Sequence, residues 1–446
     1  MKKIVVSFFC LLSYFAQSQT SFNRCAFDEV NAFHAERNPE YKNMVNAAFN
    51  NAKQYAQQNF NKRDNGDILR IPVVVHIVYN TAQENIDDSL VLNQIEVLNE
   101  DFRRKNTDTA SLRNEFLGLA TDAGIEFYLA CEDPDGNPTN GITRTVTTKT
   151  SFGNFLGTGV DEVKFDSTSG KSGWNSNEYL NIWVCNTGGA VLGLAYPPQG
   201  APNWPANAFS TDPRVQGVVV HYEVFGKNNP RAIGQLSIAD RGRTAVHEVG
   251  HYLGLRHIWG DGTLSILGIA DCTVDDGIDD TPNSGTNSQI DGCSPTKNTC
   301  NDGPGDLPDL WENYMDYSEE RCQTMFTQGQ IDIMRAMVLT ARSGLLQAKC
   351  ADTTSTNVTT KNIKNNFLVN VYPNPSNGNI NVSFANTGNN TSISITNTIG
   401  IVVYENVFSG NESTYTINTE TLSSGIYFLH VESGNKKAVK RIIIQQ

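Results

Sequence analysis

The stretch TAVHEVGHYLGLRHIWGD, residues 244–261, constrains the fold of this chain more than any other feature. Three of the seven histidines of the chain fall in it, and a glutamate follows the first of them. His247 and His251 are in i, i+4 positions, so a helix brings both side chains to one face, where they can reach one metal ion. Glycine accepts the left-handed backbone that ends a helix, so Gly254 predicts a chain reversal that brings His257 back as a third ligand.

This pattern favours a catalytic metal site over a chance cluster of core residues. Three imidazoles leave the fourth position of a tetrahedral zinc ion open for water, as in catalytic zinc sites. Glu248 is placed beside that metal, where it can accept a proton from the water that attacks a polarised carbonyl. A bare H-E-x-x-H pattern often arises by accident, but Gly254 and His257 add two positions, each matched by chance roughly one time in twenty.

The N-terminal residues indicate export. Lys2 and Lys3 precede an apolar run, and Ala16 and Ser18 supply a cleavage site, so we expect a signal peptide over residues 1–18. That run is too short to span a bilayer, and we expect no transmembrane segment elsewhere. A net charge of −13 disfavours nucleic acid and anionic membrane surfaces as partners. We therefore expect a secreted protein, which we take to be a monomer.

The length of 446 residues predicts two globular domains with accessory segments. Residues 19–64 are polar, with a modest helical pattern over 44–55 and a basic stretch, NKRD, at their end. We interpret them as a pro-segment, with a plain N-terminal extension as the alternative. Residues 351–367 have the composition of a linker. Residues 368–446 alternate polar and apolar side chains between Asn-Gly and Ser-Gly turns, which predicts a small all-β sandwich.

The pattern of residues 65–350 predicts an α/β (α+β) domain with a mixed sheet. ILRIPVVVHIVYN is typical of a buried strand, and DDSLVLNQIEVLNEDFRRKN has helical spacing. We expect further strands at GIEFYLAC, EYLNIWVCN, LGLAYPP and GVVVHYEVF. His76 and His221 fall inside strands and have no partner at ligand spacing, so we interpret both as core histidines.

The cysteines are informative because an oxidising compartment favours disulfides. Eight remain outside the signal peptide, and four of them fall in a segment rich in Asp, Gly, Pro and Asn that needs covalent or metal staples: Cys272, Cys293, Cys300 and Cys322. Sequence alone allows three pairings of these four. The same segment offers five residues with the hard oxygen ligands that calcium prefers, with a solvated acidic loop as the alternative: Asp275, Asp276, Asp279, Asp280 and Thr281.

The full pattern H-E-x-x-H-x-x-G-x-x-H, together with Met315 in ENYMDYSEERC, resembles the metzincin metalloproteases. Within that clan the chain is most similar to the pappalysin family, over most of residues 68–350. The stretches that carry this resemblance are RIPVVVHIVYN, QIEVLNEDFRRKN, EYLNIWVCN, GRTAVHEVGHYLGLRHIWGD, DDTPNS and ENYMDY. The resemblance implies a metzincin-like catalytic domain with a mixed, mostly parallel twisted sheet and an active-site helix. Such a domain would hydrolyse peptide bonds of extracellular proteins.

The resemblance also implies roles for individual residues of the catalytic motif. His247, His251 and His257 would be the zinc ligands, and Glu248 would be the general base and later the general acid. Met315 would form the hydrophobic floor beneath the zinc, a position that suits a thioether.

Further roles follow from the same resemblance. Tyr317 would help to stabilise the tetrahedral intermediate, with a core tyrosine as the alternative. The strand LGLAYPP would be the open edge that pairs with an extended peptide substrate. The disulfides would be Cys272–Cys300 and Cys293–Cys322, and related proteases bind calcium in the loop between these cysteines.

The pair Arg24-Cys25 resembles the cysteine switch of latent pappalysin-like proteases, in which a thiolate takes the zinc position that water needs. The family pattern continues with glycine, whereas this chain has Ala26. Cleavage near Arg63 would release the segment and its ligand. An ordinary disulfide from Cys25 is the alternative. If Cys25 binds zinc, one thiol stays unpaired among three: Cys131, Cys185 and Cys350.

The C-terminal 80 residues resemble the type A sorting domain of the type IX secretion system, on the stretches VYPNPSNGNINV, SSGIYFLHV and KKAVKRIIIQQ. This implies passage through the periplasm, export across the outer membrane by the type IX machinery, and removal of the domain at the cell surface. A carbohydrate- or protein-binding sandwich is the alternative, although no row of exposed aromatics marks a sugar platform.

Two function classes follow: a secreted zinc endopeptidase, and a catalytically silent, metal-stabilised surface adhesin or binding protein. Glu248 favours the peptidase, because a binding protein has no need of a proton acceptor beside a zinc-bound water. The sequence leaves bond specificity open. Glu319 and Glu320 would favour a basic substrate residue in the primed-side pocket, whereas Arg321 would favour an acidic one.

Overall fold

The computed structural model describes residues 23–59, 67–153, 159–189, 191–198, 213–260, 271–347, 369–384, 390–397, 401–409, 414–433 and 436–445. The chain divides into two compact units, residues 1–350 and 351–446. The expected signal peptide, the basic stretch around Arg63 and the expected linker lie outside the described residues. In the described ranges, no helix is both long and apolar enough to cross a membrane.

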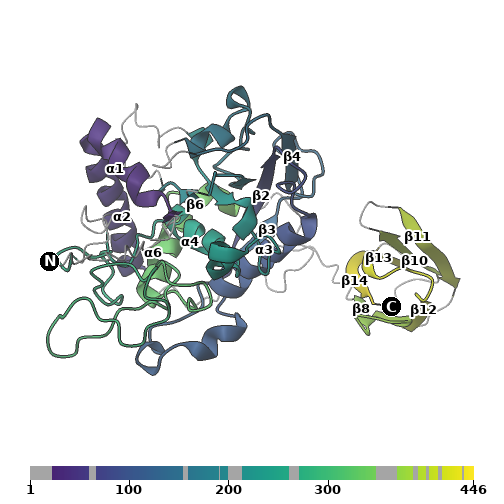
Figure 1. Ribbon diagram of the computed structural model, residues 1–446. Coiled ribbons are helices and arrows are strands. Elements are labelled where there is room, and N and C mark those ends of the chain that lie inside the picture. Colours follow the sequence, from purple (N-terminus) through teal and green to yellow (C-terminus); the bar gives the residue numbers. More distant parts are fainter. Residues whose placement is uncertain are drawn as a thin grey trace, which may run out of the picture. The chain divides into compact units, whose positions relative to one another are not determined.

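A seven-stranded sheet runs through the larger unit (Figure 1). Its strands lie in the order β1-β6-β7-β5-β2-β3, and β4 pairs with the second half of β2. Every pair is parallel except β6 with β7, so the expected mixed, mostly parallel sheet is confirmed. The strands are β1 Asn23–Cys25, β2 Leu69–Tyr79, β3 Ile125–Leu129, β4 Ile142–Val146, β5 Leu180–Cys185, β6 Val191–Ala195 and β7 Val218–His221.

The apolar run of β2 explains its central place in the sheet. Strands that are buried on both faces need apolar side chains at successive positions rather than at alternate ones. All residues of β5 and β6, and eight consecutive residues of β2 from Ile71 to Val78, are buried. Strand β2 pairs with β5 on one edge, where Val73 lies opposite Leu180, and with β3 on the other, where Val73 lies opposite Leu129.

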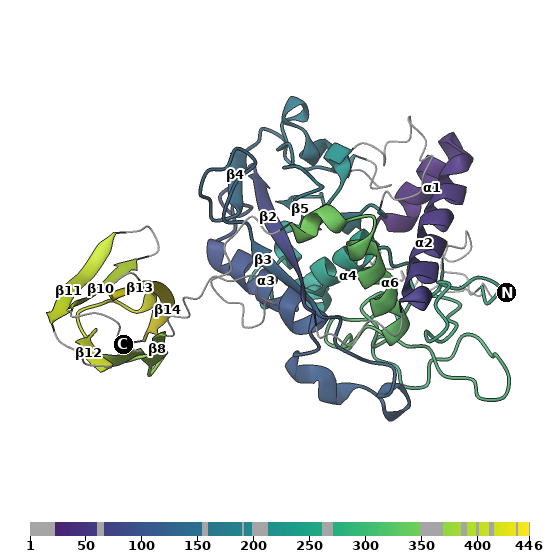
Figure 2. The same ribbon diagram turned by 180° about the vertical axis from the view of Figure 1, so that it is seen from behind.

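Helices cover this sheet and hold the N-terminal segment, a name used here for the described residues 23–59. Helices α3 and α4 pack against each other, α3 also packs on β3, and α4 packs on β6 and β7. Helix α2 packs against α6, with α1 beside α2 (Figures 1 and 2). The helices are α1 Phe27–Arg37, α2 Glu40–Gln58, α3 Asp88–Phe102, α4 Arg243–Tyr252 and α6 Gln328–Leu339.

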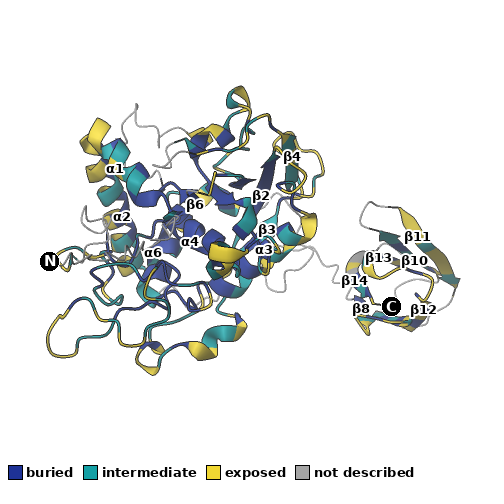
Figure 3. Ribbon diagram, in the orientation of Figure 1, coloured by how far each residue is buried: buried dark blue, intermediate teal, exposed yellow. Residues whose placement is uncertain are grey.

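The buried residues concentrate along the sheet and helix α4 (Figure 3). All ten residues of α4 are buried. His76 lies in this interior, with hydrogen-bond contacts to Thr143 Oγ1 at 2.7 Å and Asn181 Oδ1 at 2.9 Å. His221 is in contact with Thr187 Oγ1 at 3.0 Å and with a Glu223 carboxylate oxygen at 3.0 Å. Both are therefore satisfied core histidines, as expected.

The C-terminal unit is an all-β sandwich, as expected. One sheet has the order β12-β9-β8 and the other the order β11-β10-β13-β14, and all pairs are antiparallel. Ile380 and Val382 from the first sheet share a buried core with Ile393, Ile395 and Leu429 from the second. The strands are β8 Val369–Tyr372, β9 Asn379–Phe384, β10 Asn390–Asn397, β11 Val402–Ser409, β12 Thr414–Asn418, β13 Gly425–Ser433 and β14 Lys436–Ile444.

Candidate active site

Helix α4 carries the first two histidines of the motif, and both of its ends are well defined. Gly242 precedes the helix with φ 73°, and the Glu320 carboxylate accepts hydrogen bonds from the Thr244 N–H at 2.6 Å and the Arg241 N–H at 2.6 Å. A negative group at a helix N-terminus compensates the unpaired N–H groups there. Gly254 ends the helix with φ +95°, the left-handed conformation expected from the sequence, and the chain turns back toward His257.

The three histidines converge on one point. The His247 Nε2 atom lies 3.1 Å from His251 Nε2 and 3.2 Å from His257 Nε2, and the latter two are 3.1 Å apart. Each ring also has a separate oxygen partner for its Nδ1 atom: Tyr314 O at 2.7 Å, Leu255 O at 2.9 Å and Asp28 Oδ2 at 2.9 Å, in the order of the histidines. An Nδ1–H that donates to oxygen leaves the Nε2 lone pair free, as in histidines that bind metals.

These residues fit a metal ion. Burial lowers the pKa of His247 and His251 well below the usual range of histidine, which keeps the imidazoles in the neutral form that binds metals. Three lone pairs that face one another at this distance leave a position that suits a cation. Cys25 completes the group, since its Sγ atom and a nitrogen of each of the three rings all lie within 4.8 Å of one another.

Cys25 reaches this point from strand β1, which lies along the edge of β6. The pairing is parallel, with Cys25 opposite Gly193, and the Ala26 N–H donates to the Gly193 carbonyl at 3.1 Å. Cys25 is a free, fully buried thiol, so the alternative of an ordinary disulfide is not observed. The edge expected to receive a peptide is therefore covered by an extended segment of this same chain.

Glu248 lies beside the metal-site residues and is fully buried. Its carboxylate faces the Cys25 thiol on one side and the backbone of Gly193 on another. Burial raises the pKa of Glu248 well above the usual range of a glutamate, and the contact with Cys25 opposes that shift to a smaller extent. A carboxyl group with a raised pKa is suited to take up and return a proton.

The segment that precedes α6 brings Met315 against α4 and Tyr317 beside the histidines. Met315 is fully buried against α4, where a Cβ atom added to Gly250 would lie 2.5 Å from the Met315 Sδ atom. The Tyr317 ring centroid lies 4.9 Å from that of His257, and its hydroxyl donates to the Cys25 carbonyl at 3.1 Å. The Tyr317 hydroxyl is thus directed at the peptide backbone of the N-terminal segment.

Arg24 fills a pocket beside the histidines. Its Nη1 atom donates to the Tyr317 carbonyl at 2.9 Å and to the Ser318 carbonyl, and its Nη2 atom lies 3.7 Å from Glu320 Oε1. Glu320 is fully buried and points inward, whereas Glu319 pairs with Arg321 nearer the surface at 2.5 Å. Of Glu319, Glu320 and Arg321, Glu320 is therefore the side chain that faces the Arg24 guanidinium.

The contribution of Asp28 was not evident from the sequence. Its carboxylate contacts His257 Nδ1, and burial raises the pKa of Asp28 to about 7. Phe27 was missed as well, although its ring stacks on His251 with 3.8 Å between centroids. Their position directly after Cys25 was the one available signal. A segment that places a cysteine at a metal site carries its next residues into contact with the other ligands of that site.

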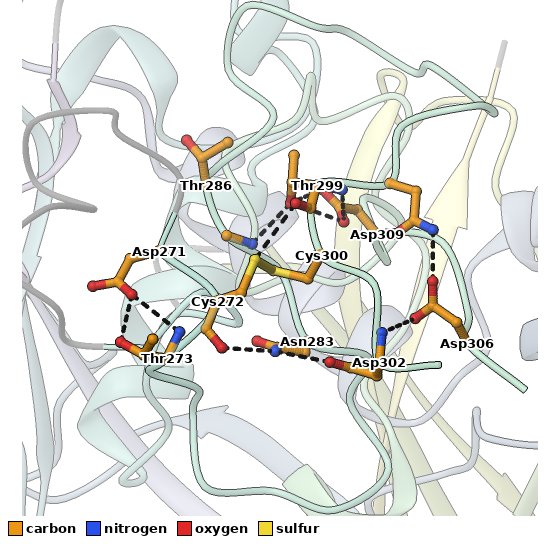
Figure 4. Close-up of a disulfide and its surroundings, with 12 residues drawn as sticks. Asp271, Cys272, Thr273, Asn283, Thr286, Thr299, Cys300, Asp302, Asp306 and Asp309 are labelled. Atoms are coloured by element: carbon orange, nitrogen blue, oxygen red, sulfur yellow. Dashed lines mark hydrogen bonds between the residues drawn. A yellow bond between two sulfur atoms is a disulfide. The ribbon is translucent and has the colours of Figure 1, made fainter. Parts of the chain in front are cut away.

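Two disulfides staple the loop between His257 and α6. Cys272 pairs with Cys300 and Cys293 with Cys322, the two pairs implied by the family resemblance. Around the first disulfide, Thr299 N–H donates to Asp309 Oδ1 at 2.9 Å and Asn283 Nδ2 donates to the Cys272 carbonyl at 3.2 Å (Figure 4). Cys131 is also disulfide-bonded. Cys185 is a free, buried thiol, so it is the unpaired one among the three cysteines outside this loop and the Cys25 site.

The five residues considered for calcium do not form one compact ligand group. Asp275 and Asp279 are exposed, and Asp279 Oδ1 is 2.8 Å from Lys53 Nζ of the N-terminal segment. Asp276 Oδ1 accepts from the Thr281 hydroxyl at 2.7 Å, and Asp280 Oδ2 accepts from the Gly329 N–H at 2.8 Å. The second oxygens of Asp276 and Asp280 are buried without a hydrogen-bond partner.

Both units of the chain match known protein families. The family model described as Pregnancy-associated plasma protein-A matches residues 164–339, and the one described as Secretion system C-terminal sorting domain matches residues 370–445. A promirolysin mutant from Tannerella forsythia is 39% identical to this chain with a TM-score of 0.60, covering 73% of this chain and 97% of its own.

Two further relatives extend the comparison. Mature Tannerella forsythia mirolysin in complex with a cleaved peptide is 43% identical with a TM-score of 0.55, covering 63% of this chain and 96% of its own. An extracellular metalloprotease from Uncinocarpus reesii is 32% identical over 223 residues, which are 50% of this chain and 70% of the relative.

The fold, the site and these relatives define a secreted zinc metalloendopeptidase with a C-terminal sorting domain of the type IX secretion system. The chain belongs to the pappalysin family of metalloproteases. Its substrates are peptides or proteins, and the sorting domain implies the secretion machinery as a partner and a secreted or cell-surface location.

Proposed function

We propose that His247, His251 and His257 hold the catalytic zinc ion of this endopeptidase. The observation that carries the proposal is the convergence of their three Nε2 atoms within 3.2 Å of one another, with each Nδ1 atom satisfied elsewhere. When bound there, zinc supplies a Lewis acid that lowers the pKa of a water and polarises the scissile carbonyl.

The residues of the chain then supply proton transfer and positioning. Glu248 accepts a proton from the attacking water and returns it to the leaving amine, a role supported by its burial and raised pKa. Tyr317 donates its hydroxyl hydrogen bond to the carbonyl oxygen as negative charge develops there. Met315 supports the site from below through its contact with α4.

The N-terminal segment is, in this proposal, a pro-segment that keeps the enzyme latent. Cys25 would supply the fourth ligand to a bound metal ion as a thiolate and so exclude water, and the Tyr317 hydroxyl donates to the Cys25 carbonyl. The departure of this chain at Ala26 from the glycine of the family pattern is accommodated, because Ala26 is buried and its N–H pairs with β6.

The positions that the N-terminal segment fills indicate how a substrate binds. Strand β6 offers the edge on which an extended peptide pairs, and β1 occupies that edge in this structure. The pocket that holds the Arg24 guanidinium combines two carbonyl oxygens with Glu320. We therefore expect a basic residue directly beside the scissile bond on its primed side. Mature mirolysin, which is similar in structure, has been solved in complex with a cleaved peptide.

Three further assignments complete the proposal. The chain divides into a signal peptide at 1–18, a pro-segment at 19–64, a catalytic domain at 65–350, a linker at 351–367 and a sorting domain at 368–446. Calcium binding in the loop rests on Asp276 and Asp280 alone of the five candidate residues, because each has a buried carboxylate oxygen without a hydrogen-bond partner. The mature enzyme acts as a monomer.

The test is cleavage of a denatured proteome by the mature enzyme, before and after a chelator removes zinc. We expect a basic residue at the first primed position, loss of cleavage on chelation, and recovery on addition of one equivalent of zinc. A matched enzyme with His251→Ala should neither bind zinc stoichiometrically nor recover. Undiminished cleavage by the chelated enzyme, or a primed-side preference for acidic residues, would contradict the proposal.

A further inference from the structure

Strand β6 contains a glycine where a strand interior favours a larger residue. Gly193 stands in the middle of VLGLA, and every residue of this strand is buried. A glycine inside a strand sacrifices packing and backbone entropy, and it often marks a close approach of another group. The backbone of Gly193 is not in the positive-φ region, so its conformation does not require glycine.

The group that approaches Gly193 is the carboxylate of Glu248. A Cβ atom built on Gly193 would lie 2.5 Å from Glu248 Cγ and 2.7 Å from Cδ, and closer still to Oε1. These separations are far inside van der Waals contact, so Glu248 and an alanine at 193 cannot keep their present positions together. Helix α4 packs directly on β6 and is buried along its whole length, so the helix itself has little freedom to retreat.

We propose that Gly193 is a positioning residue for the general base. The missing side chain leaves the space in which the Glu248 carboxylate lies, directly beneath the strand that pairs with the peptide. The register supports this role. Gly193 lies opposite Cys25, and the Gly193 carbonyl accepts a hydrogen bond from the Ala26 N–H. The peptide bond nearest the metal site therefore lies alongside this glycine. Gly193 thus pairs with the peptide through its backbone and leaves room for the Glu248 carboxylate that accepts the proton.

The consequence is specific to catalysis. An alanine at 193 pushes the carboxylate out of its space but leaves the three histidines, the Arg24 pocket and the strand edge in place. The inference rests on the proposed role of Glu248, because displacement of that carboxylate matters only if it transfers a proton.

The experiment compares three variants, each activated by a protease supplied in trans so that none depends on its own activity for processing. Gly193→Ala is the test, and Glu248→Gln defines the activity without a general base. Gly118→Ala is the matched control, because Gly118 is exposed, has no positive φ and has nothing within 4 Å of an added Cβ.

We expect Gly193→Ala to lower kcat about 10²-fold or more, in the range attributed to a general base, with KM and zinc content unchanged. Gly118→Ala should match the parent.

Each contrary outcome has a distinct meaning. Parental kcat in Gly193→Ala while Glu248→Gln is inactive overturns the inference alone, and so does a lowered kcat that accompanies loss of zinc or a raised KM. Parental turnover by Glu248→Gln overturns the proposed function instead.

Discussion

Substitution of Phe49 by alanine should loosen the hold of the N-terminal segment on the catalytic domain after the chain is cut between residues 60 and 66. Phe49 is 3% exposed, and its ring lies beneath the Arg256 guanidinium at 4.2 Å. Arg256 also donates to Asn46 Oδ1 at 2.8 Å, and Lys53 Nζ donates to the Gly277 carbonyl at 2.9 Å. These contacts of α2 do not depend on the chain beyond residue 59, so a single cut should leave the segment bound.

The magnitude follows from the burial of the ring. Truncation of a buried phenylalanine to alanine costs about 3–5 kcal/mol in a protein core. Every 1.4 kcal/mol is a factor of about ten in affinity, so Phe49→Ala should weaken retention of the cut segment by roughly 10²-fold to 4 × 10³-fold. Asn50→Ala is the matched control, because Asn50 is the next residue of the same helix and is exposed.

The assay uses the Glu248→Ala proprotein with a site for a sequence-specific protease inserted between residues 60 and 66. After cleavage, size-exclusion chromatography at decreasing protein concentration measures the fraction of segment that coelutes with the catalytic domain. The parent and Asn50→Ala should retain the segment at concentrations where Phe49→Ala has lost it. Immediate dissociation of the cut parent, or equal retention by Phe49→Ala and Asn50→Ala, would refute this reasoning.

Two other predictions concern the termini of the chain. Deletion of residues 368–446 should leave a folded protease with unchanged zinc content and turnover in vitro but abolish its appearance at the cell surface, because the catalytic unit and the sandwich have separate cores; loss of zinc from the truncated enzyme would contradict it. In the Glu248→Ala proprotein loaded with zinc, a thiol reagent should label Cys25 only after a chelator has been added; equal labelling rates before and after chelation would exclude a metal-bound thiolate.

The local part of the site was predictable because its chemistry lies in one contiguous helix and turn. The spacing of His247 and His251 and the left-handed preference of Gly254 are properties of a few neighbouring residues, and the structure places both as the sequence indicated. The large elements β2 and α3 were also predictable, since each has a long apolar pattern with one period.

The parts that were missed depend on contacts between distant segments. Helix α1 was not expected because its sequence, FDEVNAFHAER, has few apolar residues and no strong stripe, and packing on the site stabilises it. Strands β1 and β4 and helix α6 were also not expected, and β1 is three residues that pair with β6 from far away in the sequence. The inward direction of Glu320 is set by the start of α4, which no pattern around Glu320 reveals.

The most direct test of the central claim is the turnover number of the mature Glu248→Gln enzyme on one peptide with a basic residue after the scissile bond, measured with its zinc content. Glutamine keeps the size of the side chain but cannot accept the proton, and the three histidines are untouched. We expect one zinc ion per chain and a kcat at least about 10²-fold below that of the parent. Parental turnover at full zinc content would contradict a proton-transfer role for Glu248, and with it the mechanism.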